Sequence, residues 1–387
     1  MASRPAQPGR IVDLFAGAGG WDEGLRGLGY EAVGIDMDRW ACETARAAGH
    51  ERVEADIAAL DPKGFGPVWG LIGSPPCQAY STAGKGLGRI DKPRVIACAH
   101  ELAAGSDTRA DRLAECRDPR ALLTVEPLRW AIALRPRWIA LEQVPPVLEL
   151  WTLFAGLLAT HGYQAVAGVL SAERYGVPQT RKRAYLIASL DGPVALPAPT
   201  HRSYNPRRPD HVRDDERHLL PWVSMADALG CIDEAINYTN DQTNGGQRPR
   251  GLVRGANRPA RTIISSSGSW TIEHPSERDD DAVEAPEWTT RRPATTVVPS
   301  PRISAPTARD RDPDWQPGDP WPSQSKGCVR VTIEQAATLQ GFRADYPWQG
   351  SRKRCFLQIG NAVCPPVAKV VVGEATRRGS GESGAGS

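Results

Sequence analysis

One cysteine, Cys77, lies in a turn whose residues suit covalent chemistry. The turn reads Gly-Ser-Pro-Pro-Cys-Gln at 73–78 and follows an apolar run at 68–72 that predicts a strand. Because the two prolines stiffen the turn, they hold the thiol at its tip, which a cysteine buried for packing does not require. A thiolate held in this way is a candidate nucleophile. The alternative is an inert cysteine in a tight turn.

A glycine-rich turn near the N-terminus has the residue types of a nucleoside-binding site. Residues 13–20 read Asp-Leu-Phe-Ala-Gly-Ala-Gly-Gly, and glycines there let a ligand approach the backbone. Asp36 lies 19 residues beyond Gly17, at the end of the second predicted strand, where a carboxylate can accept hydrogen bonds from both ribose hydroxyls. The G-x-G-x-x-G spacing and the Lys and Ser/Thr of a triphosphate loop are missing, so the ligand need not contain phosphate.

Two other polar features are ambiguous when taken alone. Asp56 ends the third predicted strand and could accept a hydrogen bond from the exocyclic amine of an adenine, although an Asp at a strand end is more often a helix cap. The basic cluster from Arg174 to Arg183 is typical of a solvated charged turn when nothing else accompanies it.

These residues lie at the ends of elements that alternate along the first half of the chain. Apolar runs predict strands at 11–15, 32–35, 68–72, 138–141, 164–170 and 184–188, and periodic stretches predict helices at 21–28, 39–48, 121–134 and 147–160. This alternation predicts an α/β fold with a doubly wound, mostly parallel sheet. Sheets of this kind bind ligands beyond the carboxyl ends of their strands, which is where Cys77 and Asp36 would lie.

The composition changes between residues 191 and 330. Pro, Gly, Ser and Asn are frequent there and no helical period is sustained, which predicts a smaller, irregular domain. Further along, Thr332-Ile-Glu-Gln335 matches a capping box whose helix should stop at Gly341. Two prolines at 365 and 366 suit the first turn of a helix through 377. The last residues, 379–387, are typical of a flexible tail.

The overall composition sets the class of protein. The formal net charge is only +2, and the eight cysteines are scattered without a C-x-x-C pair. Reduced thiols are therefore expected, and no metal site. The chain has no apolar run of membrane-spanning length and its N-terminus lacks a signal core, so we expect a cytoplasmic protein without a membrane partner.

Five short motifs, in order, resemble those of the cytosine-C5 DNA methyltransferase family of bacterial or phage type. They are Phe15-Ala-Gly17-Ala-Gly19, Pro76-Cys77-Gln78, Glu142-Gln143-Val144, Gln179-Thr-Arg181-Lys-Arg183 and Gly360-Asn361-Ala-Val363. The resemblance spans residues 13–368 and implies a Rossmann-like, S-adenosylmethionine-dependent enzyme. One departure is Gln143, where the family has Asn; the amide is kept but lengthened, and we expect activity to survive.

The resemblance implies a mechanism on a flipped-out cytosine in a specific duplex DNA sequence, because a stacked base cannot be reached. The Cys77 thiolate would add to C6, and Glu142 would donate a proton or hydrogen bond to ring N3. Arg183 would hold the target base and Arg181 would fix the catalytic groups. Methyl transfer to C5 and loss of the C5 proton would then release the cysteine by elimination.

The resemblance also implies binding residues. Those for the cofactor would be Phe15, Gly17, Gly19, Gly20, Asp36, Met37, Asp56, Ile57, Pro76, Asn361 and Val363. Those that position the base would be Pro76, Gln78, Ser81 and Gln179. The glycines and polar residues from Ser81 to Gly88 resemble a mobile loop that closes on DNA.

The family pattern divides the chain by function. Residues 1–190 would form the first part of the catalytic, cofactor-binding domain, with an insertion near 89–116 to which no role is assigned. Residues 191–330 would be the target-recognition domain, and 331–378 would return to the catalytic domain. The segment that starts at Asp118 and contains Arg120 resembles the family's D-x-R-x-x-L stretch.

Two other functions share these motifs. A tRNA cytosine-C5 methyltransferase would use the same chemistry, but its recognition region is small, so the long 191–330 interval favours duplex DNA. A catalytically silent DNA-binding relative is disfavoured by the intact Cys77, Glu142 and Arg183. We expect a monomer that acts in restriction and modification or as an orphan or phage enzyme, where a cognate endonuclease would act on the same sequence without a stable complex.

Overall fold

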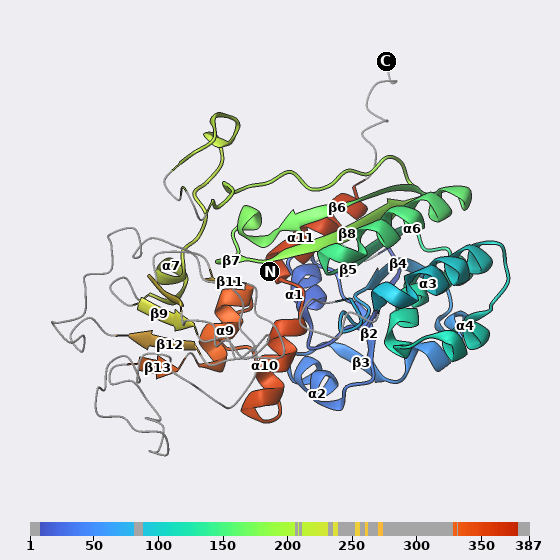
Figure 1. The fold of residues 1–387 in the computed structure, drawn as a ribbon, viewed down its shortest axis with the longest axis horizontal. Coiled ribbons are helices and arrows are strands. Elements are labelled where there is room, and N and C mark those ends of the chain that lie inside the picture. The colour runs from blue at the N-terminus through green and yellow to red at the C-terminus, as the bar shows by residue number, and fades with distance from the viewer. Residues whose placement is uncertain are drawn as a thin grey trace. The chain divides into compact units, whose positions relative to one another are not determined.

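The computed structural model describes residues 8–80, 88–205, 208, 211–230 and 332–377, together with the backbone of five short strands between 235 and 330 (Figure 1). Contacts within the chain define two compact units. The first unit consists of Met1–Leu170, Lys182–Ala198 and Val367–Ser387, and the second consists of Ser171–Arg181 and Pro199–Pro366.

The first unit is built on a seven-stranded sheet with the strand order β3-β2-β1-β4-β5-β8-β6. The strands are β1 Arg10–Leu14, β2 Val33–Asp36, β3 Glu51–Glu54, β4 Val68–Gly73, β5 Trp138–Gln143, β6 Gln164–Ser171 and β8 Lys182–Ser189. The pairs from β3 to β5 are parallel, and β8 runs antiparallel to β5. The predicted mostly parallel α/β sheet is confirmed.

The order of the strands reverses between β1 and β4. Chain connections lead from β1 outward to β2 and β3 on one side, and the next strand, β4, pairs with β1 on its other side. Such a switch point is where open α/β sheets form their ligand crevice. The glycine-rich turn follows β1 and the Cys77 turn follows β4, so the topology brings the two motifs to one edge of the sheet.

Helices alternate with the strands of this unit. They are α1 Gly20–Arg26, α2 Arg39–Ala47, α3 Gly88–Ala103, α4 Arg109–Glu115, α5 Glu126–Leu134, α6 Leu148–Thr160 and most of α11 Pro365–Ala375, with short 3-10 turns η1 Ile57–Ala59, η2 Pro62–Phe65, η3 Pro119–Val125 and η4 Pro145–Val147. Apart from their ends, α1, α2, α6 and α11 match the predicted helices. β5 is buried along its whole length, as expected for a strand covered on both faces.

The predicted helix over 121–134 is two elements. The 3-10 turn η3 ends at Val125 and α5 begins at Glu126. Pro127 explains the break, because a proline lacks an N–H and is accommodated only in the first turn of an α-helix.

The insertion near 89–116 forms the adjacent helices α3 and α4 (Figure 1). α3 belongs to the core, since Val95, Cys98 and Ala99 are fully buried. Near its start, the buried Asp91 accepts hydrogen bonds from the backbone N–H groups of Arg117 (3.0 Å) and Asp118 (2.8 Å). The inserted helices are therefore integrated into the first unit.

The second unit has its own sheet, with the order β10-β9-β12-β13. Its described elements are η5 Ala172–Tyr175, β7 Gln179–Thr180, η6 Asp214–Glu216, α7 Met225–Leu229, β9 Ala235–Tyr238, β10 Leu252–Gly255, β11 Ala260–Arg261, β12 Trp270–Glu273, β13 Cys328–Arg330, α9 Ile333–Gln340 and α10 Arg352–Asn361. β11 pairs in parallel with β7. The predicted capping box is confirmed: Thr332 caps α9 with Gln335, and Gly341 ends the helix with a φ of 92°.

One stretch, 352–375, is long and apolar enough to cross a membrane by length and composition. It consists of two helices, α10 and α11, separated at 362–364. Because 67% of its most apolar window is buried inside the protein, it has the character of core helices.

Candidate active site

The turn after β1 has an unusual backbone. Gly17 and Gly19 have φ values of 56° and 109°, and Phe15 has a φ of 58°. The left-handed region is open to glycine but costs another residue about 1–3 kcal/mol. Among the described residues other than glycine, only Phe15 and Arg135 adopt it. A strained phenylalanine beside two left-handed glycines is typical of a ligand-binding turn.

The Asp36 carboxylate lies against this turn. Its Oδ2 accepts a hydrogen bond from Gly17 N–H (2.8 Å) and its Oδ1 accepts one from Asp38 N–H (2.8 Å). Burial raises the pKa of Asp36, while the two backbone donors act in the opposite direction. Each oxygen can accept a further hydrogen bond, so the carboxylate is oriented and still able to bind a diol. The next residue, Met37, is 70% exposed.

Asp56 acts as a helix cap. Its Oδ1 accepts a hydrogen bond from Ala58 N–H (3.0 Å) at the start of η1. The following residue, Ile57, is buried. The cap that the sequence allowed is thus present, and a contact of Asp56 or Ile57 with a cofactor stays a prediction.

The Cys77 turn is held by three neighbours. Ser74 N–H donates to Leu14 O (3.1 Å), Trp21 Nε1 donates to Ser74 Oγ (2.8 Å) and Tyr80 N–H donates to Cys77 O (3.0 Å). Trp21 is itself buried, so its role is to support the turn from the core. Cys77 is half-buried, and its position on a fixed turn suits a nucleophile.

Gln143 supplies a further support. Its side chain is buried, its Nε2 donates to Pro75 O (2.6 Å), and its Oε1 accepts from Val144 N–H (2.6 Å). The amide that departs from the family's Asn therefore connects the end of β5 to the Cys77 turn.

Glu142 and Arg183 meet where β5 and β8 pair. Antiparallel register sets Glu142 opposite Tyr185, and Arg183 comes two residues before Tyr185. Arg183 Nε lies 3.0 Å from Glu142 Oε1, and the two side chains are 12% and 7% exposed. A little-exposed ion pair of this kind fixes both side chains.

Arg120 was not among the predicted site residues. Its Nε and Nη2 donate to the Asp118 carboxylate at 2.9 and 2.8 Å. These hydrogen bonds raise the pKa of Arg120, and negative charge on Cys77 contributes in the same direction. Arg120 therefore lies within electrostatic reach of Cys77. Its place in the D-x-R-x-x-L stretch was the only signal in the sequence.

Buried charges beneath the glycine turn were also missed. Arg52 Nη2 pairs with Asp22 Oδ2 (2.5 Å), and Arg52 Nε donates to Gly17 O (3.3 Å). Asp13 is fully buried, and neither carboxylate oxygen has a hydrogen-bond partner among the described residues. Burial first, and then Asp22, raise the pKa of Asp13 well above its usual value. The space for Arg52 depends on Gly34, where a Cβ would lie 2.3 Å from Arg52 Nη1.

Several predicted residues belong to the second unit. Gln179 is buried and its Nε2 donates to Gln340 Oε1 (2.8 Å) and Leu339 O (3.1 Å). Arg181, also buried, donates from Nη1 to Gly360 O (3.0 Å). These contacts connect the Q-x-R-x-R motif to α9 and α10.

The remaining predicted residues differ in their surroundings. Asn361, at the end of α10, is exposed, and Val363 is buried. The amide oxygen of Gln78 is buried without a hydrogen-bond partner among the described residues. Ser81 lies outside the described part of the chain.

Comparison with known proteins identifies a family. The family described as C-5 cytosine-specific DNA methylase matches residues 9–101 and 104–377. The type II methyltransferase M1.HphI of Haemophilus parahaemolyticus is 26% identical over 93% of this chain and 84% of that protein. The type II methyltransferase M.NgoMIV of Neisseria gonorrhoeae is 25% identical over 93% of this chain and 95% of that protein.

A solved structure supports the fold. The S. pombe Dnmt2 methyltransferase has a TM-score of 0.54 and 15% sequence identity, over 95% of this chain and 98% of that one. The family match extends over nearly the whole chain and includes every motif discussed above. The chain therefore belongs to the C-5 cytosine-specific DNA methylase family and is a DNA (cytosine-5-)-methyltransferase.

Proposed function

We propose that this enzyme methylates one cytosine within a specific duplex DNA sequence, with S-adenosylmethionine as donor and Cys77 as nucleophile. The observation that carries the proposal is the connection of Cys77 to Glu142 and Arg183. Gln143 holds the Cys77 turn through Pro75 O, and the adjacent Glu142 pairs with Arg183. A nucleophile, a carboxyl group and a cation thus lie at neighbouring strand ends.

The residues present fit the cofactor. The Asp36 carboxylate keeps acceptor capacity for a ribose diol, and the space above Gly17 is open, since a Cβ there would meet nothing within 4 Å. Phe15, Gly19 and Gly20 would line the same turn, with Met37, Asp56, Ile57 and Pro76 beside the nucleoside and Asn361 and Val363 contributing from the C-terminal motif. The bound cofactor supplies an electrophilic methyl group.

The chain's own residues perform the other steps. The Cys77 thiolate forms a bond to cytosine C6 while Glu142 donates a proton or hydrogen bond to N3, which leaves C5 electron-rich. Arg183 holds Glu142 and the base in place, and Arg181 fixes the catalytic groups. After the methyl group is on C5, loss of the C5 proton expels Cys77 and restores the aromatic ring.

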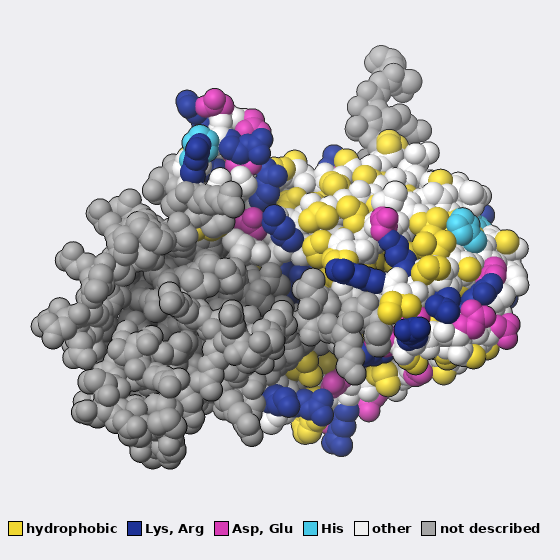
Figure 2. Space-filling model, in the orientation of Figure 1, with side chains coloured by type: hydrophobic (Ala, Val, Ile, Leu, Met, Phe, Trp, Pro, Cys, Tyr) yellow, Lys and Arg dark blue, Asp and Glu magenta, His cyan; other side chains and the backbone are white. Residues whose placement is uncertain are grey.

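DNA binding requires that the target base leave the duplex. We assign recognition of the sequence to residues 191–330 and the chemistry to 1–190 and 331–378, with Pro76, Gln78, Ser81 and Gln179 positioning the base. In the described part of the chain, Lys and Arg side chains on the visible face are interspersed with Asp and Glu (Figure 2). This agrees with a net charge of only +2 and favours recognition through individual contacts.

The biological setting follows from the relatives. Both M1.HphI and M.NgoMIV are described as type II methyltransferases, so we propose that the enzyme acts in restriction and modification, on the same sequence as a separate endonuclease. We also propose that it is a cytoplasmic monomer. A role as an orphan or phage enzyme would need no such partner.

Bisulfite sequencing of DNA from cells that express the protein tests the activity and its sequence context together. We expect 5-methylcytosine at one position of one short recurring sequence, and none when the Cys77→Ala variant is expressed. Labelled S-adenosylmethionine offered with duplex DNA and with tRNA provides the matched comparison. Transfer of label to tRNA alone would contradict the proposed substrate.

A further inference from the structure

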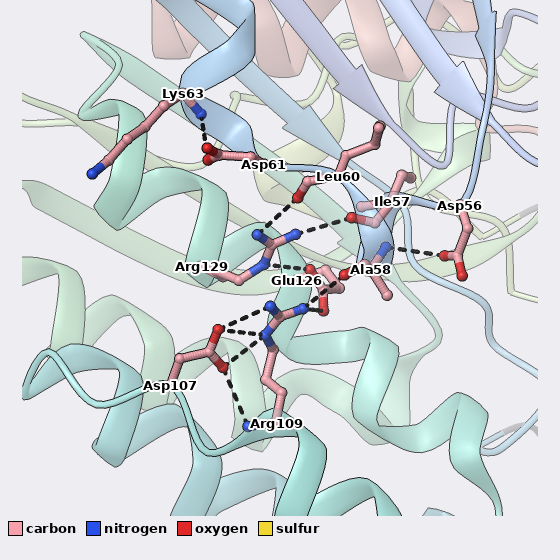
Figure 3. Close-up of polar contacts among 10 residues, drawn as sticks. All are labelled: Asp56, Ile57, Ala58, Leu60, Asp61, Lys63, Asp107, Arg109, Glu126 and Arg129. Carbon is pink, nitrogen blue, oxygen red and sulfur yellow. Dashed lines mark hydrogen bonds and ion pairs between the residues drawn. The ribbon is translucent and has the colours of Figure 1, made fainter.

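The 3-10 turn η1, which carries Ile57 and follows Asp56, is held by two arginines (Figure 3). Arg129 of α5 donates from Nη2 to Ile57 O (2.9 Å) and from Nη1 to Leu60 O (3.1 Å). Arg109 of α4 donates from Nη1 to Ala58 O (3.1 Å). Three carbonyl groups of one short turn are thus fixed by guanidinium groups from two helices.

One carboxylate connects the two arginines. Glu126 is 2% exposed, with its Oε1 at 2.7 Å from Arg109 Nη1 and its Oε2 at 2.7 Å from Arg129 Nε. Asp107 adds a second negative charge, since Arg109 Nε and Nη2 donate to it at 2.9 Å each. The buried Glu126 thus lies between two positive groups, as a charge held away from water requires, while Asp107, at 50% exposure, stays in contact with solvent.

Arg109 and Asp56 form hydrogen bonds with the same residue, Ala58. Ala58 accepts a hydrogen bond from Arg109 with its carbonyl oxygen, and its N–H donates to Asp56 Oδ1 (3.0 Å). The conformation of η1 therefore sets the direction of the Asp56 carboxylate and of Ile57 (Figure 3). A turn fastened at three carbonyls loses little entropy when a ligand binds, because it is already ordered.

Arg109 lies in the insertion near 89–116, which had no assigned role. Its helix, α4, has no fully buried residue of its own, so α4 contributes little to the core. Arg112 on the same helix pairs instead with Glu101 of α3. Through Arg109, α4 also contacts the η1 turn and Glu126 of α5.

We propose that Arg109, supplied by the insertion, is a positioning residue that acts with Glu126 and Arg129 to orient Asp56 and Ile57 for the adenine of S-adenosylmethionine. The inference rests on the proposed function, in which Asp56 accepts a hydrogen bond from the exocyclic amine of adenine. The insertion then serves cofactor affinity and selectivity for adenine.

The test compares Arg109→Ala with Arg112→Ala, a matched variant that removes an ion pair from the same helix. For Arg109→Ala we expect the Kd and KM for S-adenosylmethionine to rise about tenfold, because the variant loses a charge-assisted hydrogen-bond network. The kcat at saturating cofactor and the KM for DNA should stay within about twofold of the wild-type values. Arg112→Ala should leave all four quantities near the wild-type values. Arg109→Lys keeps the charge beside Glu126 and should recover part of the affinity.

A selectivity measurement separates positioning from loss of structure. Binding of S-adenosylhomocysteine is compared with that of S-inosylhomocysteine, in which a carbonyl replaces the exocyclic amine. The wild type should prefer the adenine compound; Arg109→Ala and Asp56→Asn should each lose most of this preference, and the double variant should lose no more than Asp56→Asn alone.

Two results would overturn the inference: unchanged cofactor affinity and preference in a folded Arg109→Ala or Arg109→Lys variant, or an equal loss in Arg112→Ala. Failure of the proposed function has a different signature, in which the wild type itself binds no S-adenosylmethionine or shows no preference for adenine. If Arg109→Ala does not fold, the Arg109→Lys variant decides. Unchanged cofactor affinity and unchanged adenine preference in Arg109→Lys would contradict the role of Arg109.

Discussion

The side-chain amide of Gln143 donates a 2.6 Å hydrogen bond to the backbone oxygen of Pro75, two residues before Cys77. Gln143 comes directly after Glu142 in β5, so one strand end provides both the candidate acid and the support for the nucleophile turn. The longer amide, in place of the Asn found in the family, reaches the turn from within the core. This contact gives a physical basis for the expectation that activity survives the departure.

Gln143→Leu should impair both stability and catalysis. The variant leaves Pro75 O buried without its donor, which costs about 1–3 kcal/mol, and it frees the Cys77 turn to move. We expect a lower thermal midpoint and a kcat reduced about tenfold or more, since small misplacement of a catalytic group is costly. Gln143→Asn keeps an amide and serves as the control, with a smaller loss of kcat. Wild-type kcat in Gln143→Leu would show that the contact does not position Cys77.

Glu142→Gln should abolish most of the activity without loss of cofactor binding. A general acid or hydrogen-bond donor in the transition state contributes about 10²–10⁴-fold, and the amide cannot supply a proton to N3. The measurement is single-turnover methylation together with the Kd for S-adenosylmethionine. Arg183→Lys keeps a positive charge next to Glu142 and is expected to lose less. A Glu142→Gln enzyme with wild-type rate would exclude proton transfer from Glu142 to N3.

Asp13→Asn should change the dependence of stability on pH. Burial raises the pKa of Asp13 well above its usual 3.8, so the folded protein keeps a proton that the unfolded chain releases. Below about pH 4 this proton stabilises the folded protein to its full extent. As the pH rises toward the pKa of Asp13 in the folded protein, the stabilisation falls by about 1.4 kcal/mol per pH unit. Asn cannot ionise, so the variant lacks this slope.

Urea unfolding between pH 4 and pH 8 measures this difference. The free energy of unfolding of Asp13→Asn, relative to wild type, should increase with pH. Asp111→Asn, at an exposed carboxyl of α4, controls for the loss of a negative charge. Parallel curves for Asp13→Asn and the wild type would mean that Asp13 is already ionised in the folded protein.

Gly34→Ala should destabilise the sheet beneath the cofactor turn. The new Cβ would lie 2.3 Å from Arg52 Nη1 and 2.7 Å from Ala16 Cβ, so Arg52 would have to leave its partner Asp22. Overpacking costs about 1–3 kcal/mol, and the buried Asp22 charge, left without Arg52, adds to it. Gly64→Ala is the control, because nothing lies within 4 Å of its Cβ position. Equal thermal midpoints for the two variants would contradict this packing.

The sequence was sufficient to predict the sheet and the position of the candidate residues at the ends of its strands. Cys77, Asp36 and Glu142 each stand at the end of an apolar run, and the parallel order follows from the alternation of strands and helices. The contacts that support them could not be predicted. Arg52 sits in the middle of a strand, and its pairing with Asp22 depends on the space left by Gly34.

The contacts of the insertion could not be predicted from the sequence either. Arg109 meets Glu126 only because two helices fold back onto η1, and no local pattern specifies such an approach. The break of the predicted 121–134 helix, in contrast, could have been found from Pro127. The division of the chain into a catalytic part and the 191–330 recognition domain stays a prediction, as do the cofactor contacts.

Trapping on DNA that contains 5-fluorocytosine tests the central claim, covalent catalysis by Cys77, most directly. Fluorine at C5 blocks the final elimination, so the enzyme stays bound to the base. The wild type is mixed with S-adenosylmethionine and a duplex library in which 5-fluorocytosine replaces cytosine throughout, and it should form a complex that survives denaturing electrophoresis. The control variant Cys116→Ala, which removes another half-buried thiol, should form the same complex. Cys77→Ala should form none while still binding cofactor; a denaturation-resistant complex with Cys77→Ala would contradict the account.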